Sequence, residues 1–270
     1  MTSINHHRTP AITLEDVSKM FTSGNRVENV LDDVTLTVYQ GEFFVVLGPS
    51  GCGKSTLLKL IAGFIAPTKG KILKANGEIV SQPGRDRAVV FQSLGTSLFP
   101  WLNVQENIEF GLRMARVPKK LRQTIVKECI EKVGLRGHER KYPSELSGGM
   151  QQRVQIARVL AINPDVLLMD EPFAALDAQT RKIMQKELVI LWRDEGKTII
   201  FVTHDIREAI SMGQRVAVMT AGPGARIKRV YEIDFPYPRD ETALHFVSLF
   251  KEIEKDIEEE VYKALCQEKL

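Results

Sequence analysis

One stretch of this sequence is best suited to chemistry, the run Gly48-Pro49-Ser50-Gly51-Cys52-Gly53-Lys54-Ser55-Thr56. Its spacing matches GxxxxGK[ST], the pattern of a phosphate-binding loop, in which glycines let backbone N–H groups turn toward an anion. In this pattern Lys54 reaches the β- and γ-phosphates and the Ser55 hydroxyl ligates Mg²⁺. The run therefore predicts binding of a nucleoside triphosphate together with magnesium.

Two adjacent carboxylates, Asp170 and Glu171, follow the apolar run Val166–Met169. Neighbouring side chains of a strand point to opposite faces, so the two are expected to do different work. Asp170 suits a magnesium ion, which takes few protein carboxylates, and Glu171 suits polarisation of a water that attacks the γ-phosphate. The alternative is an acidic pair that ends a strand in solvent.

Three further candidates come from their local setting. Ser147 is a good N-cap for the following helix, and Gly148 and Gly149 leave backbone N–H groups open to an anion, although an ordinary helix start has the same features. His204 follows an apolar strand, where it acts in chemistry or is a buried histidine with a backbone partner. Phe21 lies near a turn, where it stacks on a nucleotide base or packs at a strand edge.

The elements that position these residues alternate between strand and helix. The phosphate loop joins an apolar strand, Phe43–Leu47, to a helical pattern over Lys54–Ala62 that ends at Gly63. Buried strands alternating with helices predict a mainly parallel sheet. The later elements are strands over 87–91, 165–170, 198–203, 216–219 and 227–230, with helices over 118–133, 179–193 and 207–212.

The fold class expected is α/β, a RecA-like P-loop NTPase core. An antiparallel β unit over 11–38 precedes it, and an α-helical subdomain over about 93–163 is inserted into it. We expect an ATPase domain over 1–240 and a C-terminal helix within 241–270. The apolar stripe of that helix is expected to dock on the body, with Glu258, Glu259 and Glu260 facing solvent.

Composition narrows the class of protein. Of 270 residues 43% are hydrophobic, enough for a sizeable core, and 37 basic against 34 acidic residues do not call for a nucleic-acid partner. No apolar run reaches the roughly 20 residues of a membrane helix, and the N-terminus lacks the apolar core of a signal peptide. The three cysteines are far apart in sequence, which favours a reducing cytosol.

Six motifs, taken in order, resemble those of ATP-binding cassette (ABC) transporter ATPases: GPSGCGKST, Gln92, LSGGMQQR, VLLMDEP, Ala175-Leu176-Asp177 and His204. The resemblance implies a dimer of nucleotide-binding subunits. In such a dimer, ATP lies between the phosphate loop of one copy and the LSGG segment of the other. It also implies transmembrane permease subunits as partners, and through them an extracytoplasmic solute-binding protein. The chain is then expected in the cytoplasm, on the inner face of the membrane.

The resemblance also implies roles for single residues. Gln92 touches Mg²⁺ and relays to the permease, while Ser147 and Gly149 grip the γ-phosphate of the ATP held by the other copy. Asp177 lines the dimer interface, and His204 senses the γ-phosphate.

Within this family the chain is most similar to the importer ATPases for nitrate, sulfonates and taurine, through three segments: 100–107, 221–227 and 236–239. We expect an ATPase that drives uptake of a small anion or organosulfur solute. One alternative is a soluble ABC ATPase acting on nucleic acid or ribosomes, which usually has a coiled-coil insertion or two cassettes. Another is a P-loop small-molecule kinase, which leaves LSGGM unexplained.

Overall fold

The computed structural model describes residues 8–24, 26–91 and 97–267. These residues form two compact units, the first built from Met1–Pro83 and Gly196–Leu270 and the second from Gly84–Glu195. Gln92, a predicted site residue, lies outside the described residues. Among the helices described, none is long and apolar enough to cross a bilayer.

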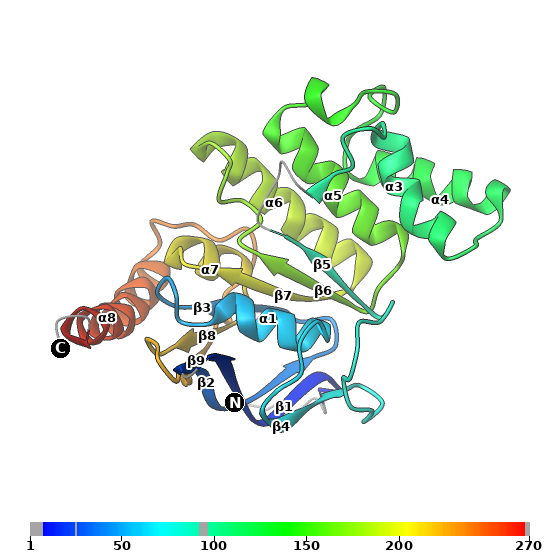
Figure 1. The fold of residues 1–270 in the computed structure, drawn as a ribbon. Coiled ribbons are helices and arrows are strands. Elements are labelled where there is room, and N and C mark those ends of the chain that lie inside the picture. The colour runs from blue at the N-terminus through cyan, green and yellow to red at the C-terminus, as the bar shows by residue number, and fades with distance from the viewer. Residues whose placement is uncertain (1–7, 25, 92–96, 268–270) are drawn as a thin grey trace. The chain divides into compact units, whose positions relative to one another are not determined.

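A parallel sheet forms the core of the first unit (Figure 1). Its central strand β3 (Phe43–Leu47) pairs in parallel with β7 (Thr198–Thr203) on one side and β8 (Arg215–Met219) on the other. Strand β9 (Ile227–Glu232) is antiparallel to β8. Every residue of β3 and β7 is buried, as strands without a polar face require.

A separate antiparallel sheet completes the β structure of this unit. Its order is β2-β1-β4, with β1 (Pro10–Ser23) in the centre, β2 (Arg26–Tyr39) on one side and β4 (Lys69–Lys74) on the other. The predicted antiparallel unit is thus confirmed and gains a third strand from beyond the phosphate loop.

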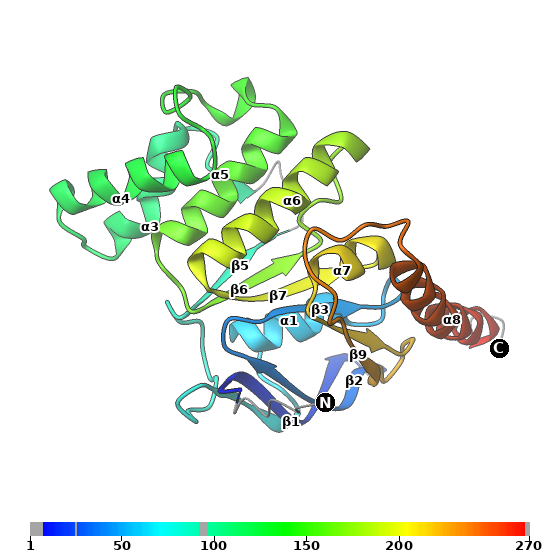
Figure 2. The same cartoon turned by 180° about the vertical axis from the view of Figure 1, so that it is seen from behind.

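Within its described residues, the first unit has three helices. Helix α1 (Lys54–Ala62) ends at Gly63, whose φ of 79° gives the left-handed cap expected of glycine there. Helix α7 (Ile206–Met212) follows β7, and the long α8 (Leu244–Gln267) lies beside α7 (Figure 2).

Helix α8 departs from the sequence pattern. Phe246 and Ile253 are buried as predicted, but Val261 and Leu265 are 40% and 54% exposed. Glu260, predicted to face solvent, is buried. The end of the helix thus covers the body with a carboxylate rather than with its apolar stripe.

The second unit combines a parallel strand pair with helices. Strands β5 (Arg87–Val90) and β6 (Val166–Asp170) are paired from Arg87 opposite Val166 to Val90 opposite Met169. The helices are α3 (Val104–Met114), α4 (Lys119–Lys132), α5 (Gly148–Ala161) and α6 (Ala178–Glu195), with a short 3-10 turn over Pro143–Glu145. Both cartoon views show α3, α4 and α5 side by side.

Candidate nucleotide-binding site

The phosphate loop leaves β3 and enters α1 within the first unit. Gly51 and Gly53 have φ of 79° and 93°, a conformation that side chains other than glycine rarely adopt. Gly53 is also closely covered, because a Cβ placed on it would lie 2.9 Å from Leu31 Cδ2 and 3.0 Å from Val30 Cγ1. Strand β2 thus fixes the point where the loop becomes helix.

The start of the loop is equally close to its neighbours. A Cβ on Gly48 would lie 2.9 Å from Cys52 Sγ and 3.2 Å from Met219 Cβ at the end of β8. Cys52 is buried, which agrees with a small residue that fits inside the loop. The start of the loop therefore packs closely against Cys52 of the loop itself and against the end of β8.

The Lys54 side chain turns back onto its own loop. Its Nζ donates hydrogen bonds to the carbonyl oxygens of Gly48, at 2.8 Å, and Pro49, at 2.9 Å. The residue is 6% exposed, so its ammonium is held inside the loop rather than in solvent. This places a positive charge next to the N-terminus of α1, where the helix dipole also favours an anion.

His204 leaves the sheet beside the phosphate loop. Leu47, the residue before Gly48, is paired with Thr203, the residue before His204. Adjacent parallel strands end at the same sheet edge, so the loop and His204 emerge next to each other there. His204 is exposed, which excludes the alternative of a buried histidine.

The backbone around His204 is fixed by polar contacts. Asp205 caps α7 by accepting hydrogen bonds from the N–H groups of Arg207, at 2.8 Å, and Glu208, at 3.2 Å. The Asp205 N–H in turn donates to Thr203 Oγ1 at 3.0 Å. The direction in which His204 leaves β7 is thereby restrained.

The paired carboxylates lie at the end of β6 in the second unit. The four residues before Asp170 are buried, and Asp170 is half-buried. Glu171 has a φ of 43°, which is uncommon for a residue other than glycine. Such backbone strain concentrates at functional sites, and it weighs against a pair that merely ends a strand.

The LSGG segment starts α5 as predicted. Ser147 is the N-cap and its Oγ accepts a hydrogen bond from the Met150 N–H at 3.3 Å. Ser147 and Gly148 are exposed, whereas Gly149 is buried. A Cβ on Gly149 would lie 2.7 Å from Thr180 Cγ2 in the first turn of α6.

Thr180 also contacts Asp177, so Asp177 lies close to the start of α5. Its Oδ1 accepts hydrogen bonds from the N–H groups of Gln179, at 3.1 Å, and Thr180, at 3.0 Å. Hydrogen bonds from the side chain and N–H of Thr180 lower the pKa of Asp177. The second unit thus places Ser147, Gly149 and Asp177 in one neighbourhood, which the sequence spacing did not indicate.

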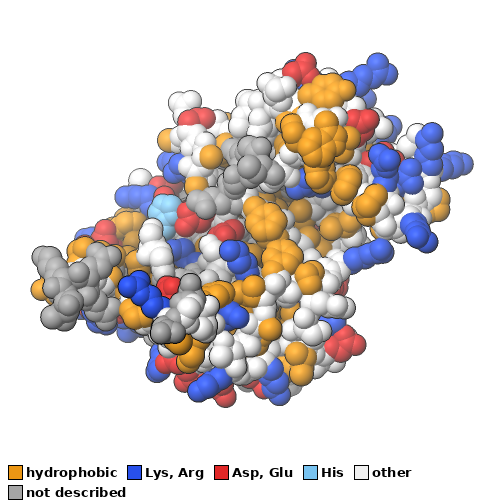
Figure 3. Space-filling view, viewed as in Figure 1, with side chains coloured by type: hydrophobic (Ala, Val, Ile, Leu, Met, Phe, Trp, Pro, Cys, Tyr) orange, Lys and Arg blue, Asp and Glu red, His pale blue; other side chains and the backbone are white. Residues whose placement is uncertain are grey.

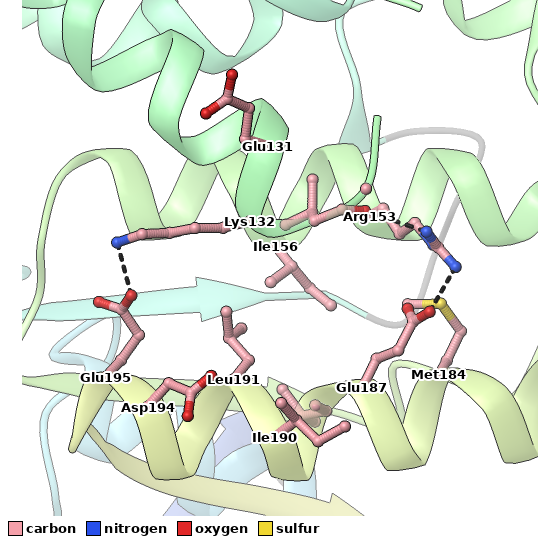
Figure 4. Close-up of a pocket in the computed structure, with 13 residues that line it drawn as sticks. Glu131, Lys132, Arg153, Ile156, Met184, Glu187, Ile190, Leu191, Asp194 and Glu195 are labelled. Atoms are coloured by element: carbon pink, nitrogen blue, oxygen red, sulfur yellow. Dashed lines mark hydrogen bonds and ion pairs between the residues drawn. The ribbon is translucent and has the colours of Figure 1, made fainter. Parts of the chain in front are cut away.

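Ion pairs join α6 to the helices that face it (Figure 4). Arg153, one turn into α5, pairs with Glu187 at 2.7 Å and also donates to the Val133 carbonyl at 3.2 Å. Lys132, at the end of α4, pairs with Glu195 at 2.6 Å. Both pairs border a cavity of about 430 Å³ with an apolar floor that includes Ile156 and Leu191. Arg153 and Glu187 thereby connect the LSGG helix to the helix that follows Asp177.

Phe21 lies near the end of β1 and is 40% exposed, so it is not a core contact of the strand edge. The Lys19 ammonium lies 4.9 Å from the centre of its ring. Part of the ring is therefore accessible, and a cation lies over one of its faces.

Comparison with known proteins decides the family. The sequence profile of the family described as ABC transporter matches residues 31–174. The chain belongs to the ABC transporter family. Its fold, with a mainly parallel sheet, an antiparallel sheet and helices, is that of an ABC ATPase, as the sequence predicted.

Individual relatives of this ABC ATPase cover most of its length. It is 51% identical to an uncharacterized ABC transporter ATP-binding protein of Methanocaldococcus jannaschii, over 94% of each chain. It is 46% identical to an aliphatic sulfonates import ATP-binding protein of Bacillus licheniformis, over 89% of this chain and 91% of the relative.

A solved structure supports the same assignment. It is a dimeric ATP-binding cassette in a post-hydrolysis state with ADP and Pi bound. The TM-score is 0.71 at 32% identity, and the match covers 83% of this chain and all of that one. This ABC ATPase therefore has both the sequence motifs and the fold of a cassette that turns over ATP.

Two contributors to the site were not predicted. Thr180 links Gly149 to Asp177, and Met219 covers the start of the phosphate loop. Thr180 is far in sequence from Gly149, and Met219 is far from Gly48, so motif spacing carried no signal for these two contacts.

Proposed function

We propose that this ABC ATPase is the ATP-hydrolysing subunit of an importer. Two copies bind two ATP molecules and drive a membrane permease supplied by other chains. The chain lies in the cytoplasm, on the inner face of the membrane. The observation that carries this proposal is a pair of anion-binding features, a phosphate loop before α1 and a capped helix start at the exposed Ser147, in a chain similar to a dimeric cassette.

The phosphate loop holds the triphosphate of ATP. The backbone N–H groups of Gly48–Thr56, except at Pro49, which has none, surround the phosphates, and Lys54 exchanges its two carbonyl contacts for phosphate oxygens. Phe21, with its exposed ring, stacks on the base. The other members of the loop set are Pro49, Ser50, Gly51, Cys52, Gly53, Ser55 and Thr56.

Magnesium suits the donor set of this chain. Ser55 offers a hydroxyl, Asp170 a carboxylate and Gln92 an amide oxygen, which are hard oxygen ligands of the kind Mg²⁺ prefers. When bound, the ion neutralises charge on the phosphate oxygens. The positive φ of Gly51 and Gly53 is a backbone geometry in which the N–H groups of the loop can turn toward an anion.

Glu171 acts as the general base. Its carboxylate accepts a proton from the water that attacks the γ-phosphate, while His204, restrained at the sheet edge, contacts that phosphate. Base assistance of this kind typically gives a rate gain of about 10² to 10⁴. Positioning of water and phosphate supplies most of the remaining rate enhancement.

Each ATP site is completed by the second copy. Ser147 and Gly149 of the partner copy bind the γ-phosphate through the start of α5, and Asp177 lies at the interface. The exposed position of Ser147 and Gly148 supports this role, because a helix start open to solvent is ready to accept an anion.

The permease binds near an aromatic cluster at the start of α3. Phe99 packs against Phe110, with ring centres 4.4 Å apart, and Trp101 is 69% exposed beside it. Figure 3 shows hydrophobic side chains gathered over this part of the second unit. The cluster follows, in sequence, Gln92, the residue expected to relay between magnesium and the permease.

The solute is a small anion or organosulfur compound such as taurine, a sulfonate or nitrate. The sulfonate-import relative, at 46% identity over 89% of this chain, supports that class. Solute selection itself belongs to the permease and to an extracytoplasmic solute-binding protein.

The dimer is tested with Glu171→Gln, which keeps nucleotide binding and removes the base. We expect this variant to become dimeric with Mg-ATP and to remain monomeric with ADP, as measured by light scattering after gel filtration. The matched control is Glu171→Gln combined with Ser147→Arg, which blocks the anion site of α5 and should stay monomeric. If Glu171→Gln alone stays monomeric at saturating Mg-ATP, the result contradicts an ATP site shared between two copies.

The transport role is tested by purifying the chain together with its permease and binding protein and reconstituting them in liposomes. ATPase stimulation is compared for taurine, alkanesulfonates, nitrate, bicarbonate and pyrimidine precursors. Trp101→Ala should lose the stimulation and keep basal ATPase, whereas Leu121→Ala, which alters an exposed side chain on α4, should keep both. Stimulation by nucleic acid instead of solute would support the soluble alternative.

A further inference from the structure

A buried carboxylate ties the C-terminal helix to the rest of the first unit. The Glu260 side chain is 2% exposed, and two lysines neutralise it, Lys263 at 2.7 Å and Lys228 at 3.2 Å from Oε1. Its other oxygen, Oε2, accepts a hydrogen bond from the Ala221 N–H at 3.1 Å. A buried carboxylate requires such partners, so this one holds α8 and the segment around Ala221 together.

The segment that Glu260 holds is the loop Thr220–Ala225 between β8 and β9. Its Gly224 N–H donates to the Asn29 carbonyl at 2.6 Å, and its Ala225 N–H to the Val30 carbonyl at 3.1 Å. The loop is therefore fixed to β2 at one end and to α8 at the other.

This loop lies beside the phosphate loop. A Cβ added to Gly222 would come into van der Waals contact with the Gly51 carbonyl oxygen, at 3.7 Å, so the two backbones are neighbours there. The same stretch of β2 contacts both loops. Val30 accepts a hydrogen bond from the Thr220–Ala225 loop, and the side chains of Val30 and Leu31 lie against Gly53 of the phosphate loop. Gly51 and Gly53 are the two positive-φ residues that direct the N–H groups of the phosphate loop.

We propose that Glu260 is a positioning residue for nucleotide binding. Through the Ala221 N–H, α8 holds the Thr220–Ala225 loop against the phosphate loop and thereby sets the affinity for ATP. The inference rests on the proposed placement of the triphosphate at Gly48–Thr56. Residue 260 lies outside the 31–174 match to the family profile, so the device is not part of the shared motif region.

Three substitutions separate the hydrogen bond from the charge. Glu260→Ala removes both, and Glu260→Gln keeps an acceptor for Ala221 while losing the charge. Glu259→Ala is the matched control, because Glu259 pairs with Lys228 at 2.7 Å, its side chain is 48% exposed, and it makes no hydrogen bond to the Thr220–Ala225 loop among the described residues. All are made in the full chain, and thermal unfolding is recorded for each.

The readouts are the dissociation constant for ATP, by calorimetry, and KM and kcat for hydrolysis. We expect Glu260→Ala to raise the dissociation constant and KM about three- to tenfold with kcat within about twofold, because a hydrogen bond to a charged acceptor is lost. Glu260→Gln should recover most of the affinity, and Glu259→Ala should bind as the wild type. Wild-type affinity in Glu260→Ala, or equal losses in Glu259→Ala, would overturn the inference.

A second measurement needs no substitution. Coupling between two sites is reciprocal, so ATP must strengthen the contact between Glu260 and the loop if that contact strengthens ATP binding. Hydrogen exchange of the wild type should show slower exchange over Ala221–Ala225 with Mg-ATP than without it. Unchanged exchange there, with protection at Gly51–Thr56, refutes the coupling and leaves the phosphate site intact.

The control for the site itself is Lys54→Ala. If that variant keeps its ATP affinity, the triphosphate lies elsewhere, and the proposed site and this inference fall together. If it loses affinity while Glu260→Ala does not, the inference alone fails.

Discussion

Gly149 lies against Thr180, with no room for a side chain between them. A Cβ on Gly149 would come within 2.7 Å of the Thr180 Cγ2 methyl, a separation that real Cβ atoms essentially never show. Thr180 also donates its N–H to Asp177. Through Thr180, the start of α5 is therefore held in a fixed position relative to Asp177, which precedes α6.

Gly149→Ala should displace that contact and lower ATPase activity at least about tenfold, since small misplacements in a catalytic site have large effects on rate. Thr180→Ser keeps the hydroxyl near Asp177 and removes the methyl. The double variant should therefore regain most of the lost activity. Steady-state ATPase assays measure both, and a double variant no better than Gly149→Ala argues against steric contact as the cause.

Lys54→Ala should weaken ATP binding by about 100-fold or more, because a buried ammonium that serves the phosphates is removed. Its Nζ lies 2.8 Å from the Gly48 carbonyl oxygen, inside the loop. Lys59→Ala, an exposed lysine in the last turn of the same helix, is the control and should bind as the wild type. Calorimetric titration with Mg-ATP decides, and equal affinities for the two variants would remove the loop assignment.

Arg153 and Glu187 should show a measurable coupling in a double-mutant cycle. Each is partly exposed, so we expect a coupling of only about 0.2–1 kcal/mol. Arg153→Ala alone should cost more, about 1–2 kcal/mol, because the Val133 carbonyl loses a donor as well. Urea unfolding monitored by circular dichroism gives the free energies, and a coupling of zero would mean that the pair does not join α5 to α6.

Docking of α8 should weaken in acid. Burial would raise the pKa of Asp256 and of Glu260, but hydrogen bonds from Tyr231 and Lys228 to Asp256, and from Lys263 and Ala221 to Glu260, lower both. A lowered pKa gives stability that is present above the ordinary values of 3.8 and 4.5 and is lost as pH falls through the folded values.

Lys228→Met removes the cation shared by these carboxylates, which lies 3.3 Å from Asp256 Oδ1. Between about pH 6 and about pH 3.5 the melting temperature of the wild type should therefore fall more than that of Lys228→Met. Lys251→Met, at an exposed position on α8, should follow the wild type. Parallel curves for all three proteins would show that the network does not contribute to the acid dependence.

Residue types and spacing predicted which residues carry the chemistry, because each predicted role depends on spacing along a short stretch. The glycine spacing from Gly48 to Gly53 led to the loop and helix observed, and Ser147 was placed as the cap of α5. The family resemblance then indicated the fold class, because few protein folds carry these six motifs in this order. Gln92 stays a prediction, outside the described residues.

Tertiary structure decided what covers each of these residues. The period of α8 placed Glu260 with its exposed neighbours, yet it is buried because the loop at Ala221 and the side chain of Lys228 cover it. Helical period defines the apolar face of a helix, but it does not reveal a polar partner supplied by a distant segment. For the same reason the contact of Gly149 with Thr180, and the emergence of Gly48 beside His204 through the pairing of Leu47 with Thr203, could be found only in three dimensions.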